Sequence, residues 1–394
     1  MIGVDRAARA GLSSAVWRRG VLKAALCLVM VGTLVAGFVE PAAADPTDPA
    51  AALASLPATT DTASDADPAD VAVDGFGDAE GYHVQVSHGG DGFSWHELAV
   101  LRPADMDVES WTGYQCLSGD GRFAAVTILP SSQANDATAR DHGAFAYSVD
   151  LGSGEVHSIA SGVGLKYYSP GCGTADSAVV TTMLGTDQAS TVLSTADLTS
   201  GAVSRSITIA GQVTSSVPTA TGLVGVMGST LVSIGEGGAV TVVATVKGDA
   251  YDLRPAADGG INFLSTEPGA DTATVHHEVG GAVTDLGTGP RTRVQLFAGR
   301  DGGAVLSGYV QIYEMAAAAA KLAAIPDGGL ADGATAASLD GGLLIGPDAN
   351  GDSGTPVQLD PSTKQVQPIL RDTAPTTATP EAGCGGRRRG RNGH

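Results

Sequence analysis

The chain has 394 residues and a formal net charge of −20, with 16% charged residues, 5% aromatic residues and 55 glycines. A surface this acidic repels nucleic acid and anionic membranes, which excludes both as partners. Few aromatic residues, many glycines and abundant Thr, Ser, Val and Ala favour short strands joined by Gly-rich turns over long charged helices.

Residues 1–44 have the form of an export signal, with five basic residues ahead of an apolar stretch at 24–39. This stretch is short for a membrane span, and the small residues that follow it predict cleavage between Ala44 and Asp45. The run Arg18–Lys23 resembles a twin-arginine signal but lacks the usual Ser or Thr before the pair, so both export routes stay open. Cleavage leaves 17 basic and 40 acidic residues, a net charge of −23. An uncleaved anchor is the alternative.

Two stretches lack the large apolar groups that a packed core needs. Residues 45–75 consist mainly of Ala, Pro, Thr and Asp and predict a disordered linker. Residues 373–394 are rich in Pro and Thr, then in Arg, and predict a disordered tail. The folded part is expected over 80–372, with its first strand at Tyr82–Val86.

Two kinds of turn alternate along the folded part. One is an Asp-Gly turn that leads into an apolar, β-branched run, as a hairpin turn leads into a strand. The other is a Ser-Gly turn between two strands. Asp-Gly turns and their variants lie at 120–121, 175–176, 221–222, 258–260, 301–303 and 340–342, and Ser-Gly turns lie within 149–156, 196–203, 234–240, 279–283 and 359–366.

Four short strands per period of about 40–50 residues are typical of a propeller blade. The sequence therefore predicts an all-β fold, a β-propeller of six to seven four-stranded blades, and the hairpin at 82–101 would complete the seventh. A sandwich or solenoid gives no reason for two alternating turn types. Within 290–328, the run Met315–Leu322 favours helix instead. The predicted units are 111–160, 164–209, 212–246, 249–287, 290–328 and 332–370.

Two of the four cysteines stand at matching places in consecutive repeats. Cys116 and Cys172 each come just before the Asp turn of their unit. Matching places in adjacent blades face each other near the propeller axis, so a disulfide between them is expected in an oxidising compartment. Two buried free thiols are the alternative.

The loop near residue 350 has two sequence patterns that could carry chemistry. Asp348, Asn350 and Asp352 have the alternate spacing of calcium loops, although the glycine comes one place late for an EF-hand. No cofactor is therefore expected, and a weakly bound calcium ion at these three residues is the alternative. Gly351-Asp352-Ser353-Gly354 copies the nucleophile motif of chymotrypsin-like serine proteases. That chemistry also needs a histidine base in a suitable context, which the chain lacks, so no catalytic residue is predicted.

The pair His276-His277 invites a metal assignment. Adjacent residues on a strand point to opposite faces, so these two histidines cannot chelate one ion. We expect a solvated strand edge instead.

Two resemblances follow from the motifs. The run Leu117–Val126, Leu-Ser-Gly-Asp-Gly-Arg-Phe-Ala-Ala-Val, resembles the start of a blade in TolB-type and WD40-like propellers, which implies fold and interaction without catalysis. More broadly, 113–116, 143–147 and 164–172 resemble the amino-terminal propeller region of large secreted actinobacterial cell-envelope and RHS-type proteins. That resemblance covers about 80–372 and implies no catalytic residues.

The sequence thus predicts a secreted, non-catalytic β-propeller that serves as a recognition or scaffold module, extracellular or associated with the cell wall. The expected partner is a cell-wall component or an extracellular protein, and the expected state is a monomer with no membrane span after signal removal. The alternative is an exported propeller enzyme that acts on polysaccharide with carboxylates at the mouth of the central channel.

Overall fold

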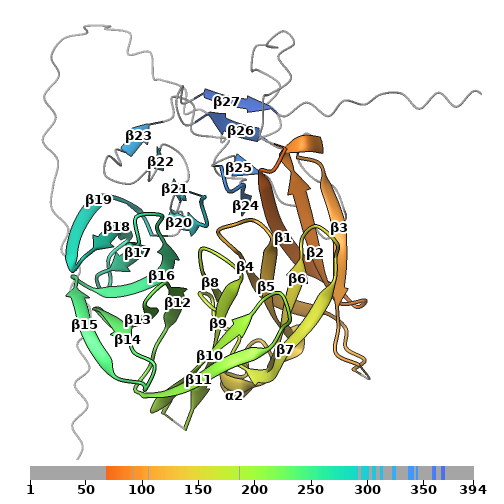
Figure 1. Cartoon of the computed structure of the whole chain (residues 1–394), viewed down its shortest axis with the longest axis horizontal. Coiled ribbons are helices and arrows are strands. Elements are labelled where there is room, and N and C mark those ends of the chain that lie inside the picture. The colour runs from red at the N-terminus through yellow and green to blue at the C-terminus, as the bar shows by residue number, and fades with distance from the viewer. Residues whose placement is uncertain are drawn as a thin grey trace, which may run out of the picture. The chain divides into compact units, whose positions relative to one another are not determined.

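The computed structural model describes residues 68–300, apart from 92, 105, 186, 292 and 293, together with 336–340. It also describes the backbone of six short strands between 304 and 368. The described chain is almost entirely β (Figure 1). The exceptions are the 3-10 turns Gly89–Asp91 and Ser131–Gln133 and the helix α2 (Ala137–His142).

The strands form small antiparallel sheets in which neighbours along the chain are neighbours in the sheet. The first sheet has three strands and the second has four. Their bounds are β1 (Val71–Gly77), β2 (Tyr82–His88) and β3 (Trp95–Leu101), then β4 (Trp111–Leu117), β5 (Phe123–Pro130), β6 (Ala144–Asp150) and β7 (Val156–Val163).

The next two sheets again have four strands each in chain order. Their bounds are β8 (Gly171–Cys172), β9 (Ser177–Leu184), β10 (Ser190–Asp197) and β11 (Val203–Ala210), then β12 (Ser215–Thr219), β13 (Gly222–Met227), β14 (Thr230–Ile234) and β15 (Val240–Thr245).

Two further four-stranded sheets and two hairpins complete the series. Their bounds are β16 (Asp249–Pro255), β17 (Ile261–Thr266), β18 (Thr272–Val279) and β19 (Ala282–Pro290), then β20 (Val294–Phe297), β21 (Ala304–Ser307), β22 (Gln311–Tyr313) and β23 (Leu322–Ala324), and finally β24 (Ala336–Ala337) with β25 (Leu343–Leu344) and β26 (Val357–Asp360) with β27 (Gln365–Pro368).

Where the two turn types of the sequence occur, each has a fixed place in its sheet. The Asp-Gly turn joins the first strand to the second: Ser118 Oγ donates to Asp120 Oδ1 at 2.7 Å, and Gly121 takes a φ of +74° that favours glycine. The Ser-Gly turn joins the third strand to the fourth: Asp150 Oδ1 accepts from the backbone N–H of Ser153 at 2.8 Å. Local turn chemistry therefore sets the meander that repeats along the chain.

Consecutive sheets touch through their first strands, from β1 and β4 through β8 and β12 to β16 and β20. Glycine makes this approach close. A Cβ on Gly77 would lie 1.8 Å from the carbonyl oxygen of Trp111, and a Cβ on Gly171 would lie 1.9 Å from that of Ser216. The first strands therefore pack backbone against backbone, and the larger side chains fill the space between sheets farther out.

The segment 336–340 returns to the first strand, which closes the series. The backbone N–H of Leu339 donates to the Val71 carbonyl at 3.0 Å, and that of Arg300 donates to the Leu339 carbonyl at 2.8 Å. The buried Asp70 carboxylate accepts from Ser338 Oγ at 2.6 Å and from the Asp340 N–H at 2.9 Å. A closed series of four-stranded antiparallel meanders that meet at their first strands is a β-propeller.

The sheets agree with the predicted units. Each unit from 111–160 to 290–328 contains one four-stranded sheet, and the hairpin expected at 82–101 belongs to the first sheet. One boundary was wrong: β1 starts at Val71, inside the stretch expected to be disordered linker. Its small apolar residues are individually weak signals, yet Ala72 is fully buried. The predicted helical run Met315–Leu322 lies outside the described residues, except for Leu322, which begins β23.

Each interface between sheets has its own apolar core. Between the first two sheets, Val84 packs with Val126 and Ile128, all of them buried.

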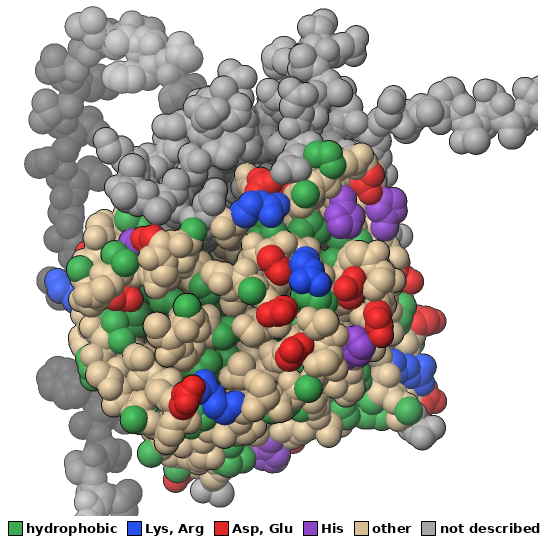
Figure 2. Space-filling model, viewed as in Figure 1, with side chains coloured by type: hydrophobic (Ala, Val, Ile, Leu, Met, Phe, Trp, Pro, Cys, Tyr) green, Lys and Arg blue, Asp and Glu red, His purple; other side chains and the backbone are tan. Residues whose placement is uncertain are grey.

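Nothing in the described part of the chain is a helix of the length and apolar character needed to cross a bilayer. Figure 2 shows acidic side chains scattered over the viewed face, with few and separated basic ones. The part of this face that the structure describes therefore lacks the continuous basic patch that nucleic acid binding needs.

Candidate functional site

A cavity of about 390 Å³ lies where the first strands of the sheets meet. Strands β1, β4, β16, β20 and β24 line it, together with the loop that precedes β8. It thus occupies the central channel of the propeller, where this fold commonly binds ligands. Its volume falls within the range of about 300–1,000 Å³ typical of small-molecule sites. The polar side chains of its lining are Gln115, Tyr167, Tyr168, Asp252, Arg254, Arg291 and Gln295.

A row of four tyrosines reaches this cavity, which Tyr167 and Tyr168 line. The ring centroids of Tyr114 and Tyr167 lie 5.0 Å apart, those of Tyr167 and Tyr168 lie 6.2 Å apart, and those of Tyr168 and Tyr251 lie 5.3 Å apart. These are distances of tilted aromatic contacts, which are favourable. Half of the chain's eight tyrosines therefore gather here, although β4, the loop before β8 and β16 are far apart in sequence. We call these four residues the tyrosine row.

The tyrosine row combines one exposed ring with partly buried phenols. Tyr167 is 72% exposed, the largest value among the exposed large apolar side chains of the described residues. Burial, together with the hydrogen bond to Tyr167, raises the pKa of the Tyr114 phenol to about 12. Burial and the nearby Asp252 carboxylate also raise the pKa of Tyr168. These hydroxyls therefore stay protonated at neutral pH and can donate hydrogen bonds to a ligand.

Asp252 and Arg254 form a charged pair in the cavity wall. Arg254 Nη2 lies 3.1 Å from Asp252 Oδ1, and the Leu296 N–H donates to Asp252 Oδ2 at 3.1 Å. Arg254 Nε donates in turn to the Leu296 carbonyl at 3.1 Å. Burial raises the pKa of Asp252, and the pull of Arg254 only partly offsets that effect. This pair joins β16 to β20 across the channel wall.

A local irregularity of β16 aims Asp252 into this position. The pairing between β16 and β17 shifts between Tyr251 and Arg254, and Asp252 itself has a φ of +53°. Such bulges re-aim side chains and are frequent next to active sites. Asp is among the few residues other than glycine that tolerate a positive φ.

The loop that carries Tyr167 and Tyr168 is held at its amino-terminal end by α2. The Leu165 N–H donates to the Arg140 carbonyl at 2.8 Å, and Lys166 Nζ forms an ion pair with the Asp141 carboxylate. Gln188 Nε2 donates to both oxygens of that carboxylate, at 2.8 and 2.9 Å. Burial alone would raise the pKa of Asp141, but the hydrogen bonds from Lys166 and Gln188 outweigh it and hold that pKa below its usual value.

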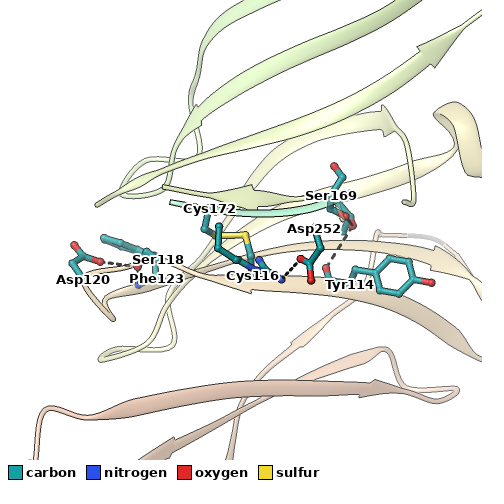
Figure 3. Close-up of a disulfide and its surroundings, with 10 residues drawn as sticks. Tyr114, Cys116, Ser118, Asp120, Phe123, Ser169, Cys172 and Asp252 are labelled. Atoms are coloured by element: carbon teal, nitrogen blue, oxygen red, sulfur yellow. Dashed lines mark hydrogen bonds and ion pairs between the residues drawn. A yellow bond between two sulfur atoms is a disulfide. The ribbon is translucent and has the colours of Figure 1, made fainter. Parts of the chain in front are cut away.

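A disulfide holds the other end of the same loop (Figure 3). Cys172 is bonded to Cys116 across the contact between β8 and β4, with Cα atoms 5.7 Å apart. The disulfide lies between the Ser118–Asp120 turn on one side and Asp252 on the other. Cys116 also lines the cavity. The structure thus brings together the two cysteines singled out in the sequence and places their bond in the channel wall.

The other residues singled out in the sequence are not near this site, or are not described. Asp348, Asn350 and Asp352, the calcium candidates, lie outside the described residues, as do Ala44 and Asp45 of the expected cleavage site. The tyrosine row was missed. Its one local signal is the pair Tyr167-Tyr168 in a chain with few aromatic residues, and its other members come together only in the fold.

The two adjacent histidines point to opposite faces of β18, as predicted. His276 Nδ1 lies 2.7 Å from Asp285 Oδ1, whereas His277 Nε2 lies 2.9 Å from Asp258 Oδ2. The expected solvated strand edge was wrong for His276, which is 4% exposed. Its ring stacks on Phe263, directly opposite in β17, so cross-strand packing buries it.

Comparisons with known proteins identify no family for this chain. No protein-family model matches the chain, and no curated protein sequence matches it. Among solved structures, TolB from Acinetobacter baumannii is 14% identical over 66% of this chain and 65% of its own, with a TM-score of 0.43. The β-propeller domain of the Trilobed protease from Pyrococcus furiosus is 14% identical over 65% of this chain and 82% of its own, with a TM-score of 0.39.

An acylaminoacyl peptidase is 11% identical over 66% of this chain, with a TM-score of 0.40. This chain spans about two thirds of the TolB chain and under half of the peptidase chain. These neighbours are TolB and other β-propeller domains, some of them attached to peptidases. The assignment of this chain as a propeller rests on its own sheets, described above.

Proposed function

We propose that this chain is an exported β-propeller binding module that receives an envelope or extracellular ligand at the mouth of its central channel. The observation that carries this proposal is the exposed ring of Tyr167 at the edge of the cavity. Burying such a ring under a ligand gains hydrophobic energy at little cost in conformational entropy, because tyrosine has only two side-chain torsions.

The loop that carries Tyr167 and Tyr168 is anchored at both ends, which suits the tyrosine row to binding. Its loop is anchored by Lys166 at one end and by the disulfide of Cys172 at the other. A surface that is already ordered before the ligand arrives pays less entropy on binding. The neutral phenols and Arg291, an exposed cation of the cavity lining, supply hydrogen-bond donors around the apolar platform. We propose a cell-wall component as the ligand, in keeping with the resemblance to secreted envelope proteins.

A binding assay on the mature chain tests this proposal. We expect isolated cell wall to retain the wild-type protein and the variant Y167A to bind about tenfold more weakly or worse, as for an aromatic hot spot. Val242→Ala is the matched control, because Val242 is 63% exposed but lies on the outer strand β15. Equal binding of all three proteins would contradict the tyrosine row as the site. Failure of the wild type to bind would contradict the envelope ligand.

A second function, hydrolysis of polysaccharide, is favoured by one observation. Asp252 is a buried carboxyl with a raised pKa in a cavity, which is a common property of a general acid. Glycoside hydrolysis usually needs a second carboxylate about 5–10 Å away. Among the described lining residues Asp252 is the one carboxylate, and Arg254 is paired with it. Sugar release by the wild type that D252N lacks would favour the enzyme over the binding module.

A further inference from the structure

A second cluster of polar side chains lies away from the channel, at the turn between β1 and β2. Asp78, Glu80 and His83 each place one ligating atom there, and these three atoms lie within 4.8 Å of one another. Asp78 is fixed by the turn itself, since its Oδ1 accepts from the backbone N–H groups of Glu80 at 2.8 Å and of Gly81 at 3.2 Å. Glu80 is exposed, so its side chain is free to turn toward the other two.

The imidazole of His83 is held in a fixed orientation. Its Nδ1 lies 2.6 Å from Glu97 Oε2 on β3, and its ring stacks on Phe76 with centroids 4.8 Å apart and planes within 9°. The residue is only 9% exposed. Its Nε2 therefore points at Asp78 Oδ1, 2.9 Å away. A histidine that ligates a metal through one nitrogen commonly donates the other N–H to a carboxylate, as His83 can to Glu97.

The charge of this cluster is unbalanced. Three carboxylates, those of Asp78, Glu80 and Glu97, surround a single imidazole. Among the described residues, His83 is the one basic group that forms an ion pair with any of them. A divalent cation would offset this excess of negative charge.

We propose that Asp78, Glu80 and His83 bind a divalent transition metal ion, with Zn²⁺ as the best fit. His83 Nε2 and one oxygen from each carboxylate would be the protein ligands, and water would complete the coordination. As the metal binds, the Nε2 proton shared with Asp78 leaves to solvent, and Nδ1–H stays donated to Glu97. Zinc binds imidazole nitrogen and carboxylate oxygen at about 2.0–2.2 Å, and imidazole selects it over Ca²⁺ and Mg²⁺. This site is independent of the proposed ligand site.

The chain contains a close counterpart that lacks the metal-binding groups. His276 in the fifth sheet also stacks on a cross-strand phenylalanine, Phe263, and also places Nδ1 near a carboxylate, that of Asp285. Its Nε2, however, lies 2.7 Å from the hydroxyl of Ser265 rather than from a carboxylate. Because a hydroxyl takes the place of the Asp78 carboxylate there, His276 serves as a matched control.

Titration of the mature chain with ZnCl₂ by calorimetry tests the proposal. We expect one equivalent of Zn²⁺ to bind to the wild type and to be lost in E80Q and H83N. We expect E97Q to weaken this binding about 10–100-fold, as for the loss of an outer carboxylate partner of a ligating histidine. H276N should bind as the wild type does.

Two outcomes would overturn the proposal: a wild type that binds no zinc, or an E80Q variant that binds one equivalent as tightly as the wild type. E80Q decides the matter even where H83N fails to fold, because Glu80 is exposed and outside the core. Circular dichroism of each variant checks that the fold is retained.

Discussion

At the scale of single residues, one absent methyl group decides how closely neighbouring sheets approach. A Cβ on Gly171 would lie 1.9 Å from the Ser216 carbonyl oxygen, which belongs to a backbone that cannot turn away. We expect G171A to lower the free energy of unfolding by about 1–3 kcal/mol or more, the usual cost of overpacking. Urea denaturation measures this free energy. Gly237→Ala is the control, because nothing lies within 4 Å of its Cβ position; equal midpoints for both variants would contradict the close approach.

The buried histidine His276 makes a pH-dependent contribution to stability. Burial lowers its pKa, and the hydrogen bond to Asp285 only partly offsets this. The unfolded chain, where a histidine has a pKa of about 6.5, then takes up a proton more readily than the folded one. The contribution of the neutral His276 to stability is therefore fully present above a pH of about 6.5 and is lost as the pH falls below this value.

The groups that face His276 are Asp285 on β19 and Ser265 and Phe263 on β17. We expect the wild type to lose more stability than H276N between pH 8 and about 5.5, because only the wild type titrates there at this position. Urea midpoints at several pH values measure the difference. A steeper loss in H276N would show that the sign is wrong.

At the scale of elements, the loop before β8 is held at both ends, and the two anchors should differ in effect. The disulfide Cys116–Cys172 closes a sequence separation of 56 residues. In the chain-entropy view such a bond contributes about 2–4 kcal/mol by restricting the unfolded chain. We expect the double variant C116S/C172S to lose stability of this size under non-reducing conditions, as measured by urea denaturation. A midpoint unchanged from the wild type would contradict it.

The other anchor, the ion pair of Lys166 with Asp141, should act on binding as well as on stability. We expect K166M to weaken ligand binding through a less ordered tyrosine row. The free energy of unfolding should fall by less than about 3 kcal/mol, because Gln188 still donates to the largely buried Asp141 carboxylate after the change. Binding and unfolding measured on the same preparation separate the two effects. Weakened stability with unchanged affinity would show that the pair does not position the loop.

The elements that the sequence predicted well are those set by local chemistry. The turns at Asp120 and Asp150 use a side-chain oxygen and a following glycine, so the local sequence alone predicts them. The tyrosine row and the cluster around His83 depend on residues that meet only after the sheets assemble. No pattern of spacing in the sequence predicts either group. The first strand was missed because its short side chains are weak signals in the sequence. The neighbouring sheet buries them, and this contact exists only in the fold.

At the scale of the whole molecule, the closure between β1 and the segment 336–340 should matter for cooperativity. Asp70 joins them through Ser338 and Asp340. We expect D70A to cost about 1–3 kcal/mol, the penalty for leaving buried hydrogen-bond partners unsatisfied. Hydrogen exchange should speed up first at the Leu339 amide, which donates to Val71. Asp187→Ala, at an exposed position, is the control. Exchange at Leu339 as slow in D70A as in the control would contradict this role.

The same closure has a consequence for how the protein is made. Asp70 finds its partner Ser338 only 268 residues later, so a nascent chain must complete nearly every sheet before its first strand is covered. Until then, the small apolar face of β1 has no neighbour on that side, and contacts so distant in sequence form slowly. The apolar face of β1 therefore stays exposed until synthesis of the chain is nearly complete.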